Sequence, residues 1–215
     1  MYETASSRIS LYLDKIFRRV LSDKVSGRII LDVGGGSGAM YSYLREHIEI
    51  TGEKLRANPL YILYDPCQEF IYYFKERYSG DPYIDIVQGY AEYMPFRDSS
   101  IDTSISSFVM RDVIDLAKSL VNMIRVSRRR VIILDFHKPP NYFFYILELL
   151  YMYLVVPIII LITEPRLLRE YLTIAYSVII QNKINELVRV YRRKLSRRIR
   201  IKCWLRCVFY LLEIE

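Results

Sequence analysis

Leu31-Asp32-Val33-Gly34-Gly35-Gly36-Ser37-Gly38 is the most informative segment of this 215-residue chain for predicting its fold. The apolar run from Arg28 to Val33 predicts a buried strand, and the glycines after it predict a tight turn into a helix over Ala39 to Ile48. Glycine lets the backbone turn sharply and lets a ligand approach without a Cβ atom in the way. The stretch therefore predicts a strand–loop–helix unit that binds a nucleotide-like ligand.

The spacing of the loop glycines and the carboxylates near them restrict the class of ligand that the loop is expected to bind. A dinucleotide-binding loop reads G-x-G-x-x-G, whereas this loop reads G-x-G-x-G. Asp32 lies two positions before the first of these glycines, and Asp65 ends the next predicted strand. A carboxylate at that place can accept hydrogen bonds from both hydroxyls of a ribose. The alternative for Asp65 is a helix cap before Pro66. We expect five residues here to contact a nucleoside cofactor: Asp32, Gly34, Gly36, Ser37 and Gly38.

Strands and helices alternate along the first two thirds of the chain. Apolar runs predict strands over residues 28–33, 60–64, 83–87, 101–108 and 131–136, and helical spacing predicts helices over 10–21, 39–48, 68–78 and 113–126. This order predicts a doubly wound α/β fold, with a parallel sheet and helices on both faces. In the remainder of the chain a further helix is predicted over 182–195. Residues 199–204 and 207–212 predict a hairpin at one sheet edge. We expect a single domain over 1–215, with an N-terminal helical segment over 1–27.

Composition and charge limit the partners and the compartment. The net charge is +7, and much of the excess lies in residues 189–198, either as a solvated helix face or as a surface attracted to lipid or nucleic acid. Three cysteines and no secretory signal at Met1 predict a reducing cytoplasm. With only two histidines, and with Cys203 and Cys207 four apart, we expect no metal site. Few Gln and Asn residues lean towards a thermophile.

Residues 142–163 are apolar except for Glu148 and are long enough to span a bilayer. Glu148, an internal proline at Pro157 and several tyrosines stand against spanning. We expect a buried or membrane-resting helical segment, and we define an apolar helical lid over 141–175.

Three further stretches make the chain resemble the class I S-adenosylmethionine-dependent methyltransferases, and within them the C-methyltransferases of menaquinone and ubiquinone biosynthesis. Residues 89–96 (GYAEYMPF) resemble that family's G-D-A-E-x-L-P-F, residues 107–113 (SFVMRDV) its S-F-G-L-R-N-V, and residues 132–139 (IILDFHKP) its L-x-L-E-F-S-K-P. The resemblance implies a class I methyltransferase (Rossmann-like) fold, a mostly parallel seven-stranded sheet with an antiparallel last strand. It implies S-adenosyl-L-methionine as cofactor and S-adenosyl-L-homocysteine as product.

The resemblance also implies further cofactor contacts, from Pro66, Tyr90, Ala91 and Ser107. Tyr90 departs from the family's Asp, which touches the adenine amino group; a tyrosine can stack on adenine or offer its hydroxyl, but it is no charge-assisted acceptor. Asp112 replaces the family's Asn, and His137 stands where the family usually has Ser. The tight turn Ser127–Arg130 replaces Lys-Pro-Gly-Gly.

Methyl transfer is an in-line displacement, so positioning supplies much of the rate and the protein must generate a nucleophile. A quinol ring carbon becomes more nucleophilic when the neighbouring hydroxyl loses its proton. A general base can remove that proton, or a cation can stabilise the phenolate that forms. Arg111, Asp112 and His137 follow strand ends and are the candidate catalytic residues: Arg111 for the phenolate or a water, Asp112 or His137 for the proton. The alternatives are that Arg111 and Asp112 cap the following helix and that His137 is a loop residue.

The function we expect is C-methylation of a demethylmenaquinol-like isoprenoid quinol, by a cytoplasmic protein in peripheral contact with the inner face of the membrane. Methylation of another small or lipidic acceptor and a non-catalytic cofactor-fold binding protein are the alternatives, and a homodimer is left open. A nucleic-acid substrate is less favoured, because the chain lacks an Asn-Pro-Pro-aromatic motif after the fourth strand.

Overall fold

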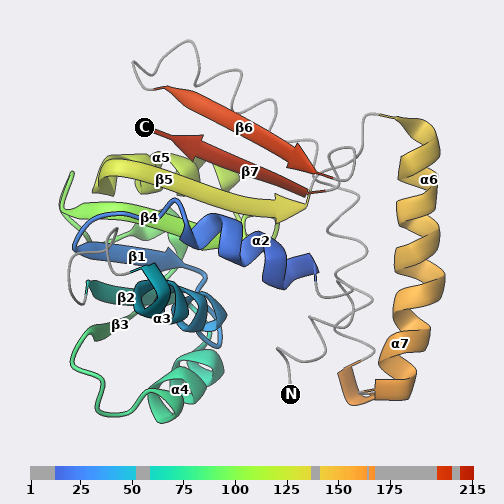
Figure 1. The fold of residues 1–215 in the computed structure, drawn as a ribbon, viewed down its shortest axis with the longest axis horizontal. Helices are drawn as coiled ribbons and strands as arrows, with labels where there is room; N and C mark the ends of the chain where they lie inside the picture. The colour runs from blue at the N-terminus through green and yellow to red at the C-terminus, as the bar shows by residue number, and fades with distance from the viewer. Residues whose placement is uncertain (1–12, 52–58, 137–140, 164, 168–197, 205–208) are drawn as a thin grey trace.

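A computed structural model describes residues 13–51, 59–136, 141–163, 165–167, 198–204 and 209–215. Its centre is a seven-stranded sheet in the order β3-β2-β1-β4-β5-β7-β6 (Figure 1). The strands are β1 (Ile29–Val33), β2 (Leu60–Asp65), β3 (Ile84–Gln88), β4 (Ile101–Ser107), β5 (Ser127–Phe136), β6 (Ile199–Trp204) and β7 (Phe209–Ile214). β1 to β5 pair in parallel, and β7 runs antiparallel between β5 and β6. The predicted sheet with its antiparallel last strand and edge hairpin is confirmed.

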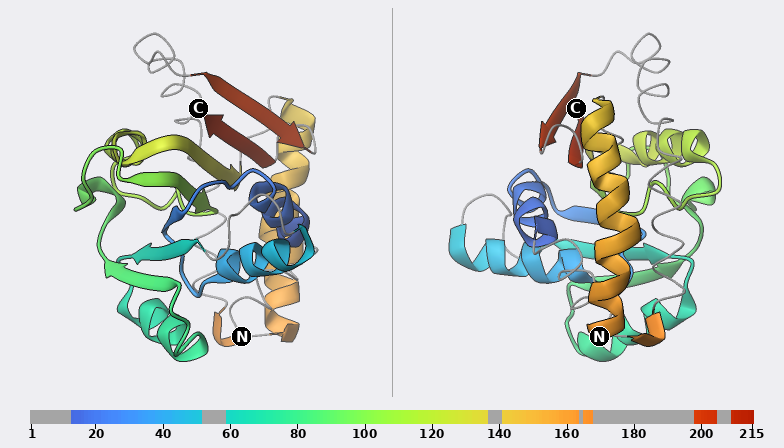
Figure 2. Two further views of the ribbon diagram at one scale, coloured as in Figure 1. Left: turned by 60° about the vertical axis from the view of Figure 1, so that its left-hand side comes forward. Right: turned by 90° about the vertical axis from the view of Figure 1, so that its right-hand side faces the viewer.

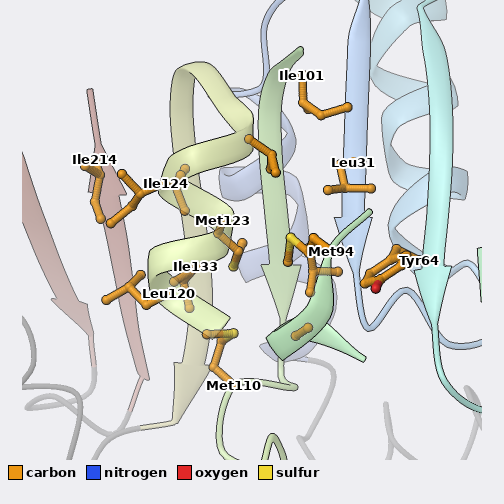
Figure 3. Close-up of a cluster of buried hydrophobic side chains, with 14 of the residues drawn as sticks. Leu31, Tyr64, Met94, Ile101, Met110, Leu120, Met123, Ile124, Ile133 and Ile214 are labelled. Carbon is orange, nitrogen blue, oxygen red and sulfur yellow. The ribbon is translucent and has the colours of Figure 1, made fainter. Parts of the chain in front are cut away.

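Helices cover both faces of this sheet, as the doubly wound prediction requires. Helices α2 (Leu13–Ser22), α3 (Ala39–Thr51) and α4 (Gln68–Arg77) contribute to one buried cluster with Leu21, Met40 and Phe74. Helix α5 (Leu116–Val126) and the 3-10 turn η1 (Ala91–Tyr93) contribute to a second cluster, which includes Leu120, Met123 and Met94 (Figure 3).

The strands are apolar on both faces because each face is covered. On β2, Tyr61 and Leu63 belong to the first cluster, whereas Ile62 and Tyr64 belong to the second. Successive strand side chains point to opposite faces, so a strand buried on both sides needs a continuous apolar run. This is why β2 shows no alternation with polar residues.

The predicted start of α5 was wrong by three residues. The helix begins at Leu116, and Asp115 is its N-cap, whose side chain accepts a hydrogen bond from the Lys118 backbone N–H at 3.0 Å. Arg111 and Asp112 therefore do not cap this helix. The Glu92 carboxylate accepts from the Asp115 backbone N–H at 2.9 Å, so a buried side chain from another segment holds the helix start.

The predicted tight turn at Ser127–Arg130 was also wrong, because β5 already begins at Ser127. The three arginines form ion pairs with acidic side chains of β4 and of the residue that follows β7. Arg128 pairs with buried Asp102, and Arg130 Nη2 lies 3.2 Å from a Glu215 carboxylate oxygen. These pairs let a strongly basic run extend a strand.

The apolar segment forms one helical rod made of α6 (Tyr142–Leu150), the π-helical turn η2 (Tyr151–Val155) and α7 (Val156–Thr163), followed by the 3-10 turn η3 (Pro165–Leu167). The backbone N–H of Val156 donates to the Tyr151 carbonyl, five residues earlier. This widened turn precedes Pro157, whose ring would otherwise crowd the preceding turn. The rod stands on the side toward which β1 and β5 point (Figures 1 and 2). The rest of the expected lid, residues 168–175, and the helix predicted over 182–195 lie outside the described residues.

Candidate functional site

The glycine loop and Asp65 lie in direct contact at the C-terminal ends of β1 and β2. The Gly36 backbone N–H donates to Asp65 Oδ2 at 2.9 Å, and the Cys67 N–H donates to Asp65 Oδ1 at 2.8 Å. Burial raises the pKa of Asp65, and these two N–H donors oppose the rise. Because each carboxylate oxygen can accept two hydrogen bonds, Asp65 keeps acceptor capacity for sugar hydroxyls. The structure thus brings together the two features that the sequence analysis paired.

Three of the four loop glycines, Gly34, Gly36 and Gly38, have positive φ angles, but they serve different purposes. The angles are 71° at Gly34, 55° at Gly36 and 83° at Gly38. A Cβ atom at Gly34 would overlap Val109, and one at Gly38 would overlap Phe74. At Gly36 a Cβ would meet none of the described atoms within 4 Å. Gly34 and Gly38 therefore permit close packing, whereas Gly36 borders open space beside Asp65.

Asp32 is buried directly beneath this loop. The Tyr61 hydroxyl donates to Asp32 Oδ2, while Oδ1 is buried without a hydrogen-bond partner among the described residues. Burial raises the pKa of Asp32 to about 7, against the lowering effects of the Tyr61 hydrogen bond and the Arg18 charge. An unsatisfied buried acceptor costs free energy, so this oxygen is a candidate ligand contact.

The remaining predicted cofactor residues follow the ends of neighbouring strands. Tyr90 follows β3 with its side chain 54% exposed, and its carbonyl accepts from the Tyr64 hydroxyl at 2.9 Å. Ala91 is buried in η1, and Pro66 is exposed just beyond Asp65. Ser37 and Ser107 are both buried.

Arg111 and Asp112 occupy the loop after β4 in very different environments. Arg111 Nη1 lies 2.9 Å from Oδ1 of Asp135, which is wholly buried on β5, and the Arg111 side chain is only 8% exposed. Asp112 is 53% exposed, and its Oδ2 lies 3.5 Å from Arg111 Nε. Desolvation raises the pKa of Asp112, and the Arg111 charge opposes it. Asp112 is therefore the solvent-accessible carboxylate, and it lies beside Arg111, whose position is fixed by the buried Asp135. His137, the third candidate, lies outside the described residues.

Two participants were missed by the sequence analysis. Asp135 was noted within a motif but given no role, and Arg18 was not singled out. Arg18 comes from α2 and donates through Nη1 to Ser107 Oγ at 2.7 Å, with its guanidinium 5.1 Å from the Phe108 ring centroid. Phe108 has a φ of 62°, an uncommon conformation for a bulky residue. The sequence offered little signal, because Arg18 and Arg19 are adjacent and helical spacing alone does not separate their roles.

These features fit a nucleoside cofactor with an amino-acid end. Asp65 offers acceptors for a ribose, Gly36 leaves space for the ligand, and Asp32 Oδ1 is an unsatisfied acceptor for a cationic group. Open α/β sheets bind their ligands at this carboxyl edge of the strands.

Comparison with known proteins agrees with this geometry. The model of the ubiE/COQ5 methyltransferase family matches residues 1–180. The chain is 29% identical over 145 residues to the ubiquinone/menaquinone biosynthesis C-methyltransferase UbiE of Hahella chejuensis, covering 65% of this chain and 57% of that protein. It is 26% identical over 144 residues to the demethylmenaquinone methyltransferase of Paenarthrobacter aurescens, covering 64% and 51%. The chain thus spans little more than half the length of these curated relatives.

Solved structures support the fold. A SAM-dependent methyltransferase of Aquifex aeolicus superposes with a TM-score of 0.58 at 17% identity, covering 97% of this chain and 90% of that one. A provisionally assigned S-adenosyl-L-methionine-dependent methyltransferase of Methanococcus maripaludis gives a TM-score of 0.64 at 13% identity, covering 98% and 90%. At these identities the likeness shows a shared fold and leaves the substrate open.

Proposed function

The chain belongs to the ubiE/COQ5 methyltransferase family, and we propose that it transfers the methyl group of S-adenosylmethionine to a ring carbon of a demethylmenaquinol-like isoprenoid quinol. One observation carries the methyl donor: Gly36 opens on free space while its N–H is bonded to Asp65. The relatives' names, which concern ubiquinone and menaquinone biosynthesis, support the quinol as acceptor.

We assign the cofactor contacts to the residues at this edge. Asp65 with Pro66 beside it would hold the ribose, Gly34, Gly36, Ser37 and Gly38 would line the space above β1, and Tyr90 with Ala91 would face the adenine. Asp32 and Ser107 would lie nearest the amino-acid end. The bound cofactor supplies an electrophilic methyl group, so this chain must orient the acceptor and remove a proton from it.

Asp112 is the side chain we assign as general base. It is accessible, and its raised pKa brings it closer to the working pH than an ordinary aspartate, which favours proton transfer. Arg111, fixed by Asp135, holds a positive charge beside Asp112, where it would also stabilise a phenolate. His137 remains a second candidate for the proton.

The acceptor's long hydrocarbon tail requires access from a membrane, and the apolar rod is the candidate contact. By length and composition Tyr142–Ile162 could cross a bilayer, with 21 residues and a mean hydropathy of 2.4. Its buried apolar residues Met152, Val156 and Ile160 form one stripe at four-residue spacing. Large apolar side chains remain exposed at Tyr142, Phe143, Ile146, Leu147, Leu150, Tyr153, Leu154, Val155, Ile158, Leu161 and Ile162.

This distribution favours lipid over a second protein copy as the partner. A helix–helix contact covers one stripe, whereas the exposed apolar positions surround most of the rod, and exposed apolar patches on soluble monomers are seldom so extensive. Because one stripe packs inward, we propose that the rod lies in the surface of the bilayer rather than across it.

The methyl transfer is tested with purified protein, a reduced short-chain demethylmenaquinol and S-adenosylmethionine carrying a trideuteromethyl group. Mass spectrometry should show the label on the quinone ring. Protein that binds S-adenosylhomocysteine in calorimetry yet labels no quinol would refute the acceptor and leave the methyl donor standing.

Flotation with phosphatidylcholine vesicles at high salt tests the rod, because high salt screens charge and isolates the apolar contribution. The double variant Leu154→Asp with Ile158→Asp should lose flotation. The matched control, Tyr72→Asp, changes an equally exposed apolar residue on α4 and should float normally. A wild type that fails to float but forms dimers abolished by the double variant would identify the rod as an interface between copies instead.

A further inference from the structure

One charged side chain, Glu148, interrupts the apolar rod between Tyr142 and Thr163. Its Oε2 atom is buried and has no hydrogen-bond partner among the described residues. Desolvation by burial raises the pKa of Glu148 to about 7. An unsatisfied buried carboxyl costs free energy that a leucine at the same position would not, and buried polar groups are nearly always paired in folded proteins. Glu148 is therefore a candidate contact for a ligand rather than a feature that the fold needs.

Glu148 lies on the side of the rod that packs inward. Within α6 the half-buried side chains are those of Phe144, Tyr145, Glu148 and Leu149, whereas the other positions of this helix are exposed. The same side of the rod continues into three buried residues, Met152, Val156 and Ile160. The carboxyl thus lies away from the exposed apolar side chains that we assign to the lipid surface.

The position of α6 brings this inward side to the edge of the sheet where the site lies. α6 begins at Tyr142, shortly after β5 ends at Phe136, and Glu148 follows about 9 Å further along the helix axis. In Figure 1 the rod stands beyond the C-terminal ends of β1 and β5, and the right-hand view of Figure 2 shows it crossing in front of the sheet. Arg111 and Asp112 follow β4 at the same edge. Glu148 therefore faces the side of the molecule where an acceptor must bind.

The chemistry of the proposed acceptor offers a partner for this carboxyl. A demethylmenaquinol-like quinol carries two hydroxyls on opposite sides of its ring. One adjoins the carbon that receives the methyl group, and we assign removal of its proton to Asp112. The other, the tail-side hydroxyl, adjoins the carbon that bears the hydrocarbon tail. Because the tail leads to the rod and the bilayer, the tail-side hydroxyl is the one that meets the rod. A carboxylate is a strong acceptor for such a hydroxyl, and a protonated carboxyl still accepts through its carbonyl oxygen.

We propose that Glu148 accepts a hydrogen bond from the tail-side hydroxyl of the quinol, so that the protein selects acceptors with two free ring hydroxyls over their monoethers. This inference rests on the proposed quinol acceptor and is independent of the residues that hold S-adenosylmethionine. Glu148 orients the ring and Asp112 removes the proton, so the two carboxyl groups have separate roles.

Two short-chain acceptors test the proposal: the demethylmenaquinol and its monomethyl ether at the tail-side hydroxyl. The wild type should have a lower KM for the quinol than for the ether. Glu148→Leu should raise the KM for the quinol by about 10- to 100-fold, the loss of one charged hydrogen bond, and should change the KM for the ether little. Its affinity for S-adenosylhomocysteine should stay at the wild-type value. The matched control is Glu76→Leu, the same substitution at an exposed glutamate of α4, which should change neither KM.

Thermal unfolding separates this role from a structural one. Glu148→Leu removes an unsatisfied buried carboxyl and should unfold at the same temperature as the wild type or a higher one. Glu148→Gln keeps an acceptor oxygen in the same shape and should lose only part of the quinol affinity, which preserves the test if Glu148→Leu folds poorly.

Three outcomes would overturn the proposal. An equal rise in KM for both acceptors would mean that Glu148 only supports the fold, and an unchanged KM for the quinol in Glu148→Leu would mean that no hydrogen bond forms. In either case a wild type that methylates the quinol leaves the proposed function standing. A wild type that binds S-adenosylhomocysteine but labels neither acceptor would overturn the quinol acceptor and this inference together.

Discussion

Arg111 and Asp135 form a buried ion pair that ties the loop after β4 to β5. Nη1 and Oδ1 lie 2.9 Å apart, and the Arg111 backbone N–H donates to Oδ2 at 3.2 Å. Asp135 is fully buried. Desolvation raises the pKa of Asp135, and the Arg111 charge with three hydrogen bonds opposes that rise. The pair therefore fixes the position of the site loop from inside the protein.

Arg111→Met should destabilise the protein strongly and in a pH-dependent way. Removing one member of a buried pair typically costs about 3–5 kcal/mol, because the other charge is left uncompensated. Without Arg111 the pKa of Asp135 should rise further, so the carboxyl becomes neutral at low pH and the loss should be smaller at about pH 5 than at about pH 8. Urea unfolding at both values measures this. An equal loss at both would show that Asp135 does not carry the uncompensated charge.

Gly36→Ala should impair binding far more than folding. A positive φ disfavours alanine by about 1–2 kcal/mol, and the new Cβ would enter the open space beside Asp65. S-adenosylhomocysteine affinity should fall by about tenfold or more. Gly80→Ala is the matched control, since Gly80 has a φ of 84° and open surroundings. Gly80 precedes β3, so it lies toward the N-terminal ends of the strands, whereas the glycine loop lies at their C-terminal ends. It should cost similar stability and leave binding intact; parallel losses of affinity in both variants would contradict the assignment.

Asp32→Asn should stabilise the protein at neutral and higher pH. Burial raises the pKa of Asp32 from 3.8 to about 7, so between these values the folded protein holds a proton that the unfolded chain has lost. The extra bound proton therefore raises the free energy of unfolding by up to about 4 kcal/mol below pH 3.8. This stabilisation is lost as the pH rises through about 7, the pKa of Asp32 in the folded protein. Asn carries no charge, so thermal unfolding of the variant should vary less with pH over this window. The other charges acting on Asp32, Arg18 and Asp65, are unchanged in the variant.

The same titration should appear in ligand binding. Below about pH 7 Asp32 holds a proton, which it must lose to accept an ammonium group, so S-adenosylhomocysteine affinity should weaken as the pH falls. Calorimetry across this range should give a pH-dependent affinity for the wild type and a weaker, flat profile for Asp32→Asn. Parallel slopes in the two proteins would assign the titration to another group.

Asp112→Asn should lower the rate of quinol methylation with little effect on folding. A positioned general base contributes about 10²- to 10⁴-fold, and Asp112 is half exposed, so the variant should keep wild-type stability and S-adenosylhomocysteine affinity. Single-turnover labelling measures the step. A wild-type rate in this variant would show that Asp112 is not the general base and would assign that role to His137 or to a water.

Local patterns in the sequence were sufficient for the scaffold. The apolar runs of β1 to β5 and the glycines after β1 determine the conformation of their own segments, so the strands, the turn and the order of the helices could be predicted. Asp65 could be placed beside the glycine loop because parallel strands end at the same edge of the sheet. The start of α5 could not, because its cap depends on Asp115 held by Glu92 from another segment.

The doubly wound sheet, the glycine loop and the family of the chain could all be predicted from the order of the amino acids. Which polar groups face one another became clear from the packed fold: Arg18 contacts Ser107 across 89 residues of chain, and Arg111 contacts Asp135 across 24. Strand and helix periods are short-range properties of the backbone, whereas the partner of a buried charge depends on packing between distant segments, which no local pattern encodes.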